Sequence, residues 1–505
     1  MADLVRLELL PLGVTLHVER GTPLQDVLFA QGVEFPCGGR GRCKGCKIRL
    51  LAGSLPISGE ERQKLTAAEL ADGWRLACRG QADGDLKIDL AQWETLILGD
   101  ESVFAFEPQE GLGVAVDLGT TTIVAQLLDL RTGRVLAVRT GLNAQAQHGA
   151  DIMSRVDFGA RGGLAALRDL VRRQMGAMIG DLLAAAPAAG GLRHVVLVGN
   201  TVMHHLFCGL TVEPLARHPF EPEDDGLQVF RASDVGWRLP AHPEVRFLPC
   251  LGGFVGSDLL AGILATQLHE SATPVALIDL GTNGEIVIGN RERILCASTA
   301  AGPAFEGARI SMGMRAATGA ISEVTVHDGT LRCHALGNVP PRGICGSGLV
   351  DAVAAGLDLR LIQPSGRLAV NGEWTLQPPV ALTQQDIREL QLAKGAIAAG
   401  VRILAQQWGT RMEDLGRVHL AGAFGNYIKR VSARRIGLLP FPPDQVQPAG
   451  NTALLGAKLA LFRLHADDGA YADLRRKTRH VSLNEDAAFQ EIYVEEMQFP
   501  AAMPG

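Results

Sequence analysis

The sequence predicts a multidomain fold of mixed class, in which a small β-rich α+β domain precedes a larger α/β region built twice from one unit. Three observations lead to this prediction. The chain of 505 residues is too long for one ordinary hydrophobic core. A stretch dense in cysteine and glycine lies near its start, and an apolar strand ending in Asp-x-Gly-Thr occurs twice further on. We therefore expect roughly two to four domains.

Composition and charge exclude several classes of protein. Apolar residues make up 47% of the chain and charged residues 20%, which is typical of a globular protein in water. The formal net charge of −6 and the scattered basic residues favour neither nucleic acid nor an anionic membrane surface as a partner. The first residues lack the pattern of a signal peptide, and no stretch approaches the about 18 apolar residues of a membrane helix, so we expect a cytoplasmic protein.

The first domain is expected to span residues 1–92. Residues 4–19 have the pattern of two short strands, and the stretch "TPLQDVLFAQG" has helical spacing up to Gly32. Further strands are expected within 46–55 and 71–90. Residues 93–112 contain Pro108 and Gly111 without a steady apolar period, which is typical of a linker.

Four cysteines of the first domain have the spacing of an iron-sulfur site. A [2Fe-2S] cluster takes four thiolates, three on one loop and one far downstream, and the candidate ligands are Cys37, Cys43, Cys46 and Cys78. The first gap holds five residues, so the loop resembles the adrenodoxin branch of ferredoxins. Glycines allow such a loop to wrap tightly and aim amide N–H groups at sulfur; they are Gly38, Gly39, Gly41 and Gly45. The alternative is a structural zinc site, although zinc ribbons usually present two C-x2-C pairs and Cys78 stands alone.

The rest of the chain contains an internal duplication. The stretch "GVAVDLGTTTIVAQLLDL" begins at residue 113, and "PVALIDLGTNGEIVIG" at residue 274 repeats its pattern, with Asp279 in the place of Asp117. A second pair, "HVVLVGNTVMHHLF" and "RVHLAGAFGNYI", supports the same arrangement. One ancestral unit used twice predicts two halves, residues 113–272 and 273–505. Long helices are expected over 164–186 and 383–409.

The two Asp-x-Gly-Thr turns are candidate phosphate sites. Such a turn presents backbone N–H groups and hydroxyls to phosphates, and the aspartate at the strand end can hold a divalent metal or orient a water. A plain hairpin turn is the alternative for each turn taken alone. The candidate residues are Gly119, Thr120, Thr121 and Thr122 in the first turn and Gly281, Thr282, Asn283 and Gly284 in the second.

These motifs resemble the superfamily of actin, sugar and acetate kinases and chaperone ATPases, whose two RNase H-like halves close on ATP. The resemblance implies that Asp117 and Asp279 are catalytic and bind Mg2+-ATP or its attacking water. The stretch "LAGAFGN" resembles the adenosine motif, which implies contacts from Gly422, Ala423, Gly425 and Asn426. "GICGSGLVDAV", 343–353, resembles the connecting helix beside the nucleotide; a helix start packed closely for structural reasons is the alternative.

An N-terminal ferredoxin joined to this ATPase resembles one narrower family, the reductive activators of corrinoid proteins. "LVGNTVMHHLF", "AAGPAFEGARI" and "GICGSGLVD" are similar to motifs of that family. The resemblance implies a β-grasp [2Fe-2S] domain, ATP hydrolysis, and transfer of one electron to the Co(II) form of a corrinoid protein or cobalamin-dependent methyltransferase, which regenerates Co(I). It also implies an upstream electron donor.

Two further expectations concern partners. The loop 296–307 is expected to face the corrinoid, with Ser298 or Thr299 as the hydroxyl near cobalt; a simple glycine turn is the alternative. Only some 20 residues separate Leu90 from Gly113, so we expect the middle domain of the family to be absent, which weakens the inference of a homodimer.

Other functions remain open from the sequence. The rivals are a small-molecule kinase with an attached ferredoxin, an ATPase activator of another low-potential metalloenzyme such as a 2-hydroxyacyl-CoA dehydratase, and an assembly partner in which the ATPase is a switch. His204 and His205 are expected to be packed side chains without a metal. Buried thiols are expected for Cys208, Cys250, Cys296, Cys333 and Cys345.

Overall fold

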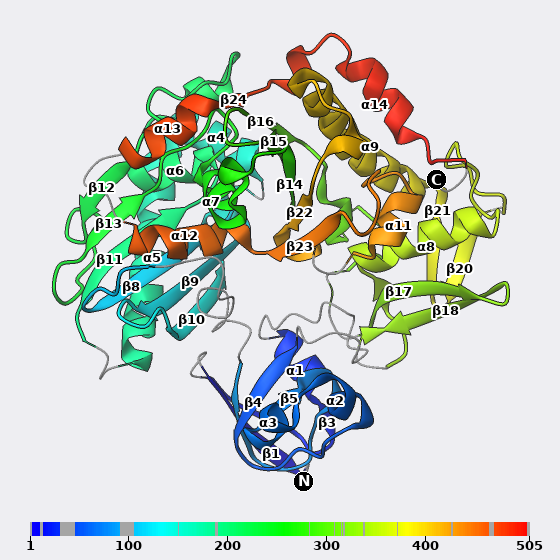
Figure 1. The fold of residues 1–505 in the computed structure, drawn as a ribbon, viewed down its shortest axis with the longest axis horizontal. Coiled ribbons are helices and arrows are strands. Elements are labelled where there is room, and N and C mark those ends of the chain that lie inside the picture. The colour runs from blue at the N-terminus through cyan, green and yellow to red at the C-terminus, as the bar shows by residue number, and fades with distance from the viewer. Residues whose placement is uncertain are drawn as a thin grey trace.

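The structure is a computed structural model in which a small N-terminal domain lies beside two larger lobes (Figure 1). It describes residues 3–10, 14–30, 46–90, 106–149, 151–186, 190–281, 283–307, 309–314, 316, 319–336, 339–370, 372–425, 428–463 and 469–501. None of the helices in these ranges combines the length and the apolar composition needed to cross a bilayer.

The N-terminal domain is a five-stranded mixed sheet of the β-grasp type, as expected. Its strand order is β2 (Val14–Glu19), β1 (Leu4–Leu10), β7 (Leu86–Asp89), β4 (Lys47–Ala52), β5 (Trp74–Leu76). β1 runs antiparallel to β2 and parallel to β7. Alternate residues of β1, Val5, Leu7 and Leu9, are buried, and the helix α1 (Leu24–Ala30) packs on the same core. A short pair, β3 (Thr22–Pro23) with β6 (Gln81–Ala82), completes the domain.

Two short helices of this domain were not predicted. α2 (Gly59–Lys64) and α3 (Ala67–Ala71) each begin with a capping box, formed by Ser58 with Glu61 and by Thr66 with Glu69. In each box the hydroxyl accepts from a backbone N–H at the helix start, and the carboxylate accepts from the backbone N–H of the cap residue. Helices this short make few internal hydrogen bonds, so their caps contribute much of their stability. Their short length also leaves too few residues for an apolar period to be recognised in the sequence.

The two lobes repeat one sheet topology, which confirms the predicted duplication. In each lobe, three strands that are consecutive in the chain form an antiparallel meander. Two later strands then add in parallel orientation on the other side of the first strand of that meander. The first-lobe sheet has the order β10 (Val135–Leu142), β9 (Thr122–Asp129), β8 (Leu112–Leu118), β11 (Leu192–Val198), β13 (Glu244–Phe247), β12 (Gln228–Arg231). The second-lobe sheet has the order β23 (Val446–Gly450), β22 (Val418–Ala421), β14 (Val275–Leu280), β15 (Gly284–Gly289), β16 (Ile294–Thr299), β24 (Thr478–His480).

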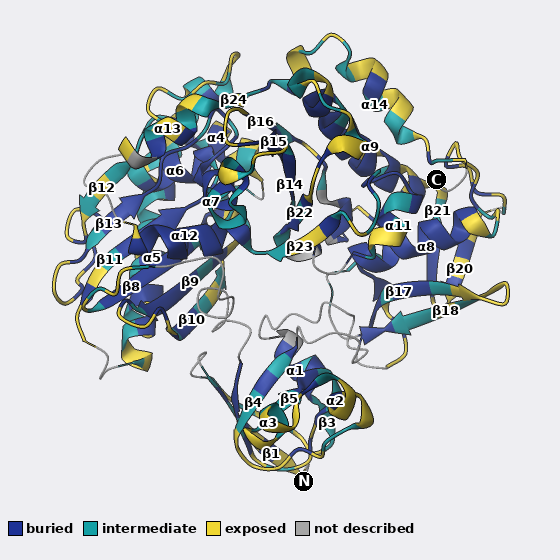
Figure 2. Cartoon of the chain, in the orientation of Figure 1, coloured by how far each residue is buried: buried dark blue, intermediate teal, exposed yellow. Residues whose placement is uncertain are grey.

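The central strands of both lobes are largely buried (Figure 2), and alternation along each strand places side chains in two separate core layers. Val114 and Val116 of β8 pack outward in one cluster with helices α5 (Leu164–Ala185) and α6 (Thr201–Cys208), which follow the short helix α4 (Ile152–Phe158). Ile278 of β14 packs outward with α8 (Gly346–Asp358) and α9 (Gln384–Trp408). Ala115 and Leu277 point to the opposite faces, where they share a cluster with α7 (Ser257–Thr266) and α12 (Thr452–Phe462). The helices α7 and α12 therefore form the inner layer between the sheets.

The second lobe carries an addition that has no counterpart among the described residues of the first lobe and that the sequence did not predict. Its parts are β17 (Ala320–His327), β18 (Thr330–Ala335), β19 (Gly343–Ile344), and the hairpin β20 (Glu373–Gln377) and β21 (Val380–Thr383). α8 packs against β17, and the short helices α10 (Gly422–Gly425) and α11 (Arg430–Arg435) follow β22. Near the C-terminus α14 (Phe489–Met497) packs on α9.

Two segments link the parts of the chain. The last residues of the predicted linker pack on α12: the ring of Phe106 lies 4.4 Å from that of Phe462, and the Gln109 amide donates to the Phe462 carbonyl. Near the other end, α13 (Gly469–Lys477) contacts the first lobe through an ion pair of Arg475 with Asp225, and β24 directly after it joins the second-lobe sheet.

Candidate functional site

Two of the four predicted cluster ligands lie together at one end of the N-terminal sheet. Cys46 precedes β4 and Cys78 follows β5, and these strands pair with Lys47 opposite Leu76. The two sulfur atoms are 3.4 Å apart, well beyond the about 2.05 Å of a disulfide bond. Two thiol groups held in contact without a bond suit a shared metal site. Cys37, Cys43 and the glycines between them lie outside the described residues.

Asp117 and Asp279, predicted from the repeat, end the central strands of the two lobes. Asp117 follows Ala115 by two residues and Asp279 follows Leu277 by two, so both carboxylates lie on the inner faces of their sheets. There they meet the N-termini of the two inner helices. Asp258 is in the first turn of α7, and Asn451 caps α12 and donates from its amide to Asp117 over 2.8 Å.

The second-lobe sheet adds two more polar side chains in one row. Asp279 pairs with Glu285 on β15, and Glu285 pairs with Ser298 on β16. Cross-strand partners lie on the same face of a sheet, and the Ser298 hydroxyl accordingly donates to Glu285 over 3.4 Å. We call Asp117, Asp258, Asp279 and Glu285 the carboxylate site.

The carboxylates of this site share raised pKa values. Burial raises the pKa of Asp117 to about 6, which the Asn451 amide partly offsets. Burial and the Asp117 carboxylate raise the pKa of Asp258 to about 7. Burial, then Asp258 and Asp117, raise the pKa of Asp279 to about 7. Burial, then Asp258 and Asp279, hold the pKa of Glu285 well above its ordinary value. All four side chains remain partly exposed, and a cluster of like charges in such surroundings favours a cationic ligand.

The first predicted phosphate turn is fixed by hydrogen bonds from two asparagines. Gly119 N–H donates to the Thr122 carbonyl, and a Cβ atom on Gly119 would lie 2.5 Å from that oxygen, so the turn requires glycine. Asn143 donates from its side chain to the Gly119 carbonyl and from its backbone to Thr121. The Asn200 amide donates to the Thr120 hydroxyl over 2.9 Å.

The second turn and the predicted adenosine motif lie beside Asp279. Gly281 N–H donates to the Asn283 carbonyl, and Gly284 begins β15. Gly422 has a φ of +84°, and a Cβ atom there would lie 2.6 Å from Asp279 Oδ1. Gly422 therefore allows the predicted adenosine segment to approach the carboxylate site. Gly425 ends α10; Thr282, Asn426 and the side chain of Ala423 are outside the described part of the chain.

The expectation of a loop over 296–307 is wrong for its first residues, because Ile294–Thr299 is strand β16. Because Ser298 pairs with Glu285 on the neighbouring strand, its side chain lies on the same face of the sheet as the carboxylate site. Thr299 lies on the opposite face and is 7% exposed, so its hydroxyl is inside the lobe.

The histidine pair and the remaining cysteines lie in packed surroundings. A ring nitrogen of His204 bonds the Gly226 carbonyl, and one of His205 bonds the Thr201 carbonyl. Burial lowers the pKa of His204 to about 3 and also lowers that of His205, so both rings are neutral. Among the described residues no three or more His, Cys, Asp or Glu side chains form a metal-binding group. Cys250, Cys296 and Cys345 are buried, whereas Cys208 and Cys333 are half-buried.

The sequence analysis missed Asp258, Glu285, Asn200 and Asn451. A signal for two of them was present. The stretches "GSDLLAGILA" from Gly256 and "GNTALLGAKLA" from Gly450 are a third repeated pair, which places Asp258 and Asn451 at equivalent helix starts.

Comparison with known proteins agrees with this architecture. A sequence profile of a 2Fe-2S iron-sulfur cluster binding domain matches residues 7–82, and a profile of the C-terminal ASKHA domain of RACo matches residues 273–504. A profile of the RACo middle region matches residues 112–271. The expectation that the middle part of the family is absent is therefore wrong: the first lobe occupies its place.

Individual relatives cover most of the chain. The corrinoid activation enzyme RamQ of Eubacterium limosum is 34% identical over 77% of this chain and 70% of its own length. The [Co(II) methylated amine-specific corrinoid protein] reductase of Methanosarcina barkeri is 28% identical over 77% of each. A solved structure, the reductive activator for corrinoid, iron-sulfur protein, superposes with a TM-score of 0.69 at 25% identity over 98% of both chains. With its ferredoxin domain, its duplicated ATPase fold and these relatives, the chain belongs to the family of reductive activators of corrinoid proteins.

Proposed function

We propose that this protein uses ATP hydrolysis to return the cobalt of a corrinoid protein from Co(II) to Co(I), by transfer of one electron. One observation carries the proposal: a thiol pair suited to a cluster and a carboxylate site built from both halves of a duplicated ATPase occur in one chain. The relatives named as a corrinoid activation enzyme and a corrinoid protein reductase support this function.

The cluster ligands in this proposal are Cys37, Cys43, Cys46 and Cys78. A [2Fe-2S] cluster bound there supplies single electrons at a potential of about −400 mV, typical of plant-type ferredoxins. The strand pair β4–β5 brings the sulfur atoms of Cys46 and Cys78 to 3.4 Å, which supports these two thiols as ligands of one cluster.

Asp117 and Asp279 are the proposed catalytic carboxylates, which hold Mg2+ with the nucleotide or orient the attacking water. Mg2+ keeps several waters and takes few carboxylates when it binds through substrate phosphates, which agrees with the absence of a three-ligand group among the described side chains. Gly119 to Thr122 and Gly281 to Gly284 are the proposed phosphate turns, and Gly422 to Asn426 the adenosine segment.

ATP can drive electron transfer only if it binds two arrangements of the protein with different affinities. The inner helices α7 and α12 meet both lobes, and their first residues contact the carboxylate site. We therefore propose that nucleotide occupancy changes the angle between the lobes and with it the surface offered to the corrinoid partner. Ser298, in the same row as Asp279 and Glu285, is the proposed hydroxyl near cobalt.

The partner is a corrinoid-binding protein or a cobalamin-dependent methyltransferase, met transiently, and a separate donor reduces the cluster. We propose the cytoplasm as the compartment, because thiols such as Cys250 and Cys296 lie apart in the core without disulfides. A homodimer is a candidate assembly that light scattering of the purified chain would test.

The decisive experiment mixes chemically reduced protein, Mg2+-ATP and a candidate Co(II) corrinoid protein under anaerobic conditions. Appearance of the Co(I) visible spectrum with ATP, and its loss without ATP, is the expected result. Equal reduction in both mixtures would overturn the role of ATP. Phosphorylation of an added small molecule, without any change at cobalt, would favour the kinase alternative.

A further inference from the structure

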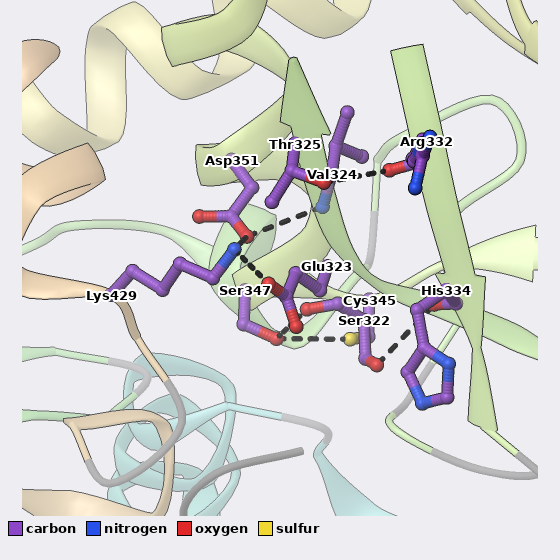
Figure 3. A network of polar contacts seen from close by, with 10 residues as sticks. All are labelled: Ser322, Glu323, Val324, Thr325, Arg332, His334, Cys345, Ser347, Asp351 and Lys429. Carbon is purple, nitrogen blue, oxygen red and sulfur yellow. Dashed lines mark hydrogen bonds and ion pairs between the residues drawn. The ribbon is translucent and has the colours of Figure 1, made fainter. Parts of the chain in front are cut away.

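Figure 3 shows an ion cluster of the second lobe in which two buried carboxylates meet a lysine whose side chain is 35% exposed. Lys429 directly precedes α11, and its ammonium group contacts two carboxylates, Asp351 on α8 at 2.9 Å and Glu323 on β17. Both acidic residues are in the protein interior, Asp351 with 2% and Glu323 with 5% of its surface exposed. We call these three residues the Lys429 cluster.

The Lys429 cluster joins three elements from distant parts of the chain. The Asp351 carboxylate also accepts from the Val324 backbone N–H at 3.2 Å, so it ties α8 to β17 as well as to Lys429. A second contact holds the same pair of elements, because the Ser347 hydroxyl at the start of α8 donates to the Ser322 carbonyl at 3.0 Å. α8 and β17 are thus fixed to each other, and Lys429 is one of the residues that attach the third element to them. The Ser432 hydroxyl on α11 also bonds Asp351, and Arg435 of α11 pairs with Asp358.

That third element is the chain that leaves the carboxylate site. It runs from β22 through Gly422, beside Asp279, and reaches Lys429 seven residues later. Ile428, next to Lys429, is buried in the core of the second lobe. β22 therefore fixes one end of the proposed adenosine segment, and the Lys429 cluster lies shortly after the other end of its described part, Gly425.

The charges show why Lys429 is needed at this point. Burial raises the pKa of Asp351, and the Lys429 ammonium acts in the opposite direction. Two buried carboxylates would repel each other without a cation between them. Removing the cation alone leaves both buried charges uncompensated, which is strongly destabilising. Loss of Lys429 would remove the ionic contact nearest to the adenosine segment, while Ser432 and Arg435 still join α11 to α8.

We propose that Lys429 is a positioning residue for the nucleotide: through Asp351 and Glu323 it holds the described part of the adenosine segment, Leu420–Gly425, in the arrangement that receives adenosine. This inference rests on the proposed nucleotide function. Lys429 acts on the base and ribose end of the ligand through the segment, whereas the phosphate turns at Gly119 and Gly281 belong to other elements.

The test compares the binding of Mg2+-ATP with that of Mg2+-tripolyphosphate, which lacks adenosine, by calorimetry on the full chain. If Lys429→Met leaves only about a tenth of the molecules in the competent arrangement, the Kd of ATP rises about tenfold. The Kd of tripolyphosphate stays unchanged, and Lys429→Arg restores ATP affinity. Equal weakening of both ligands, or an unchanged Kd of ATP, would overturn the proposal.

A matched control exists at the other end of α11. Arg435 bonds Asp358 on α8 at 2.6 Å, so Arg435→Met also removes an ion pair between α11 and α8, but away from the segment. Because Arg435 bonds Asp358 and the Pro500 carbonyl, neither of which belongs to the adenosine segment, its loss is expected to keep ATP affinity within about twofold. An ATP loss as large as that of Lys429→Met would show that any loosening of α11 suffices, and would refute the specific role of Lys429.

Two further measurements distinguish failure of the Lys429 role from misfolding of the variant and from failure of the proposed adenosine site. If Lys429→Met does not fold, the triple variant with Glu323→Gln and Asp351→Asn removes the unpaired charges; ATP affinity is expected to remain weak, and full recovery would overturn the proposal. If the unaltered protein binds ATP no better than tripolyphosphate, the adenosine site itself is wrong. A preference for ATP that survives in Lys429→Met refutes only the positioning role.

Discussion

Replacement of Asn451 by alanine should shift the pH dependence of ATP turnover. Its side chain oxygen caps α12 by accepting from Leu454 N–H, and its amide donates to the Asp117 carboxylate, both over 2.8 Å. The amide stabilises the ionised form of Asp117, so the substitution raises the pKa of this residue above its present value of about 6.

The size of the shift follows from the geometry. A hydrogen bond to a charged group contributes about 1.5–3 kcal/mol, and part of that returns as water reaches the partly exposed carboxylate. One pKa unit corresponds to about 1.4 kcal/mol, so we expect a rise of about one unit. The ionised fraction of Asp117 then falls about fivefold at pH 6 and about twofold at pH 7, and hardly changes at pH 8.5.

The assay measures kcat/KM for ATP in partner-stimulated hydrolysis by Asn451→Ala from pH 5.5 to 8.5, because this quantity reports the pKa of the nucleotide-free protein; thermal unfolding is measured alongside. The acidic limb of the profile should move up by about one pH unit, and loss of the cap should lower stability by about 1 kcal/mol. Thr383→Ala removes the cap of α9, where the hydroxyl accepts from Asp386 N–H, and should lower stability without moving the limb. An unmoved limb in Asn451→Ala, with full stability loss, would refute the assigned role of Asp117.

Three further outcomes are expected. Cys46→Ser should lower the iron content and visible absorbance while nucleotide affinity is kept. Cys250 is a buried thiol of the first lobe, so Cys250→Ser should leave the cluster intact. Equal iron content in the two variants would contradict the proposed ligand set. Asp279→Ala should keep the cluster spectrum and abolish ATP-driven reduction of Co(II), and loss of the spectrum as well would refute independent sites. Gly456→Val should cost about 1–3 kcal/mol in denaturant unfolding because its Cβ would meet the α7 backbone. Gly180→Ala, with nothing within 4 Å, should instead raise stability by up to about 1 kcal/mol.

The strands and the duplication could be predicted because their signals are local. Asp117 and Asp279 each follow an apolar strand and precede a glycine turn, and two copies of that pattern imply one fold used twice. The long helices α5 and α9 have clear spacing, and Thr383 and Gly409 mark the ends of α9. The spacing of the cysteines likewise predicts a cluster site, of which Cys46 and Cys78 are the described half.

Other parts of the site depend on contacts that no local pattern encodes. Asn451 reaches Asp117 across 334 residues, because α12 of the second half packs into the first. Glu285 and Ser298 meet through strand register, and a shift of one residue would turn both away from Asp279. The Lys429 cluster depends on α8 and on β17, and β17 belongs to a sheet that has no counterpart among the described residues of the first lobe.

The raised pKa values of the carboxylate site also imply that the protein releases protons when it binds Mg2+-ATP. With pKa values of about 6 to 7 for Asp117, Asp258 and Asp279, a share of these groups is neutral at pH 7, and arrival of a divalent cation with ATP would ionise them. Hydrogen ions would then leave for the solvent, so the heat of binding measured in phosphate and in Tris would differ in proportion to the ionisation heats of the two buffers. An identical heat in both would mean that the acids were already charged before the nucleotide arrived.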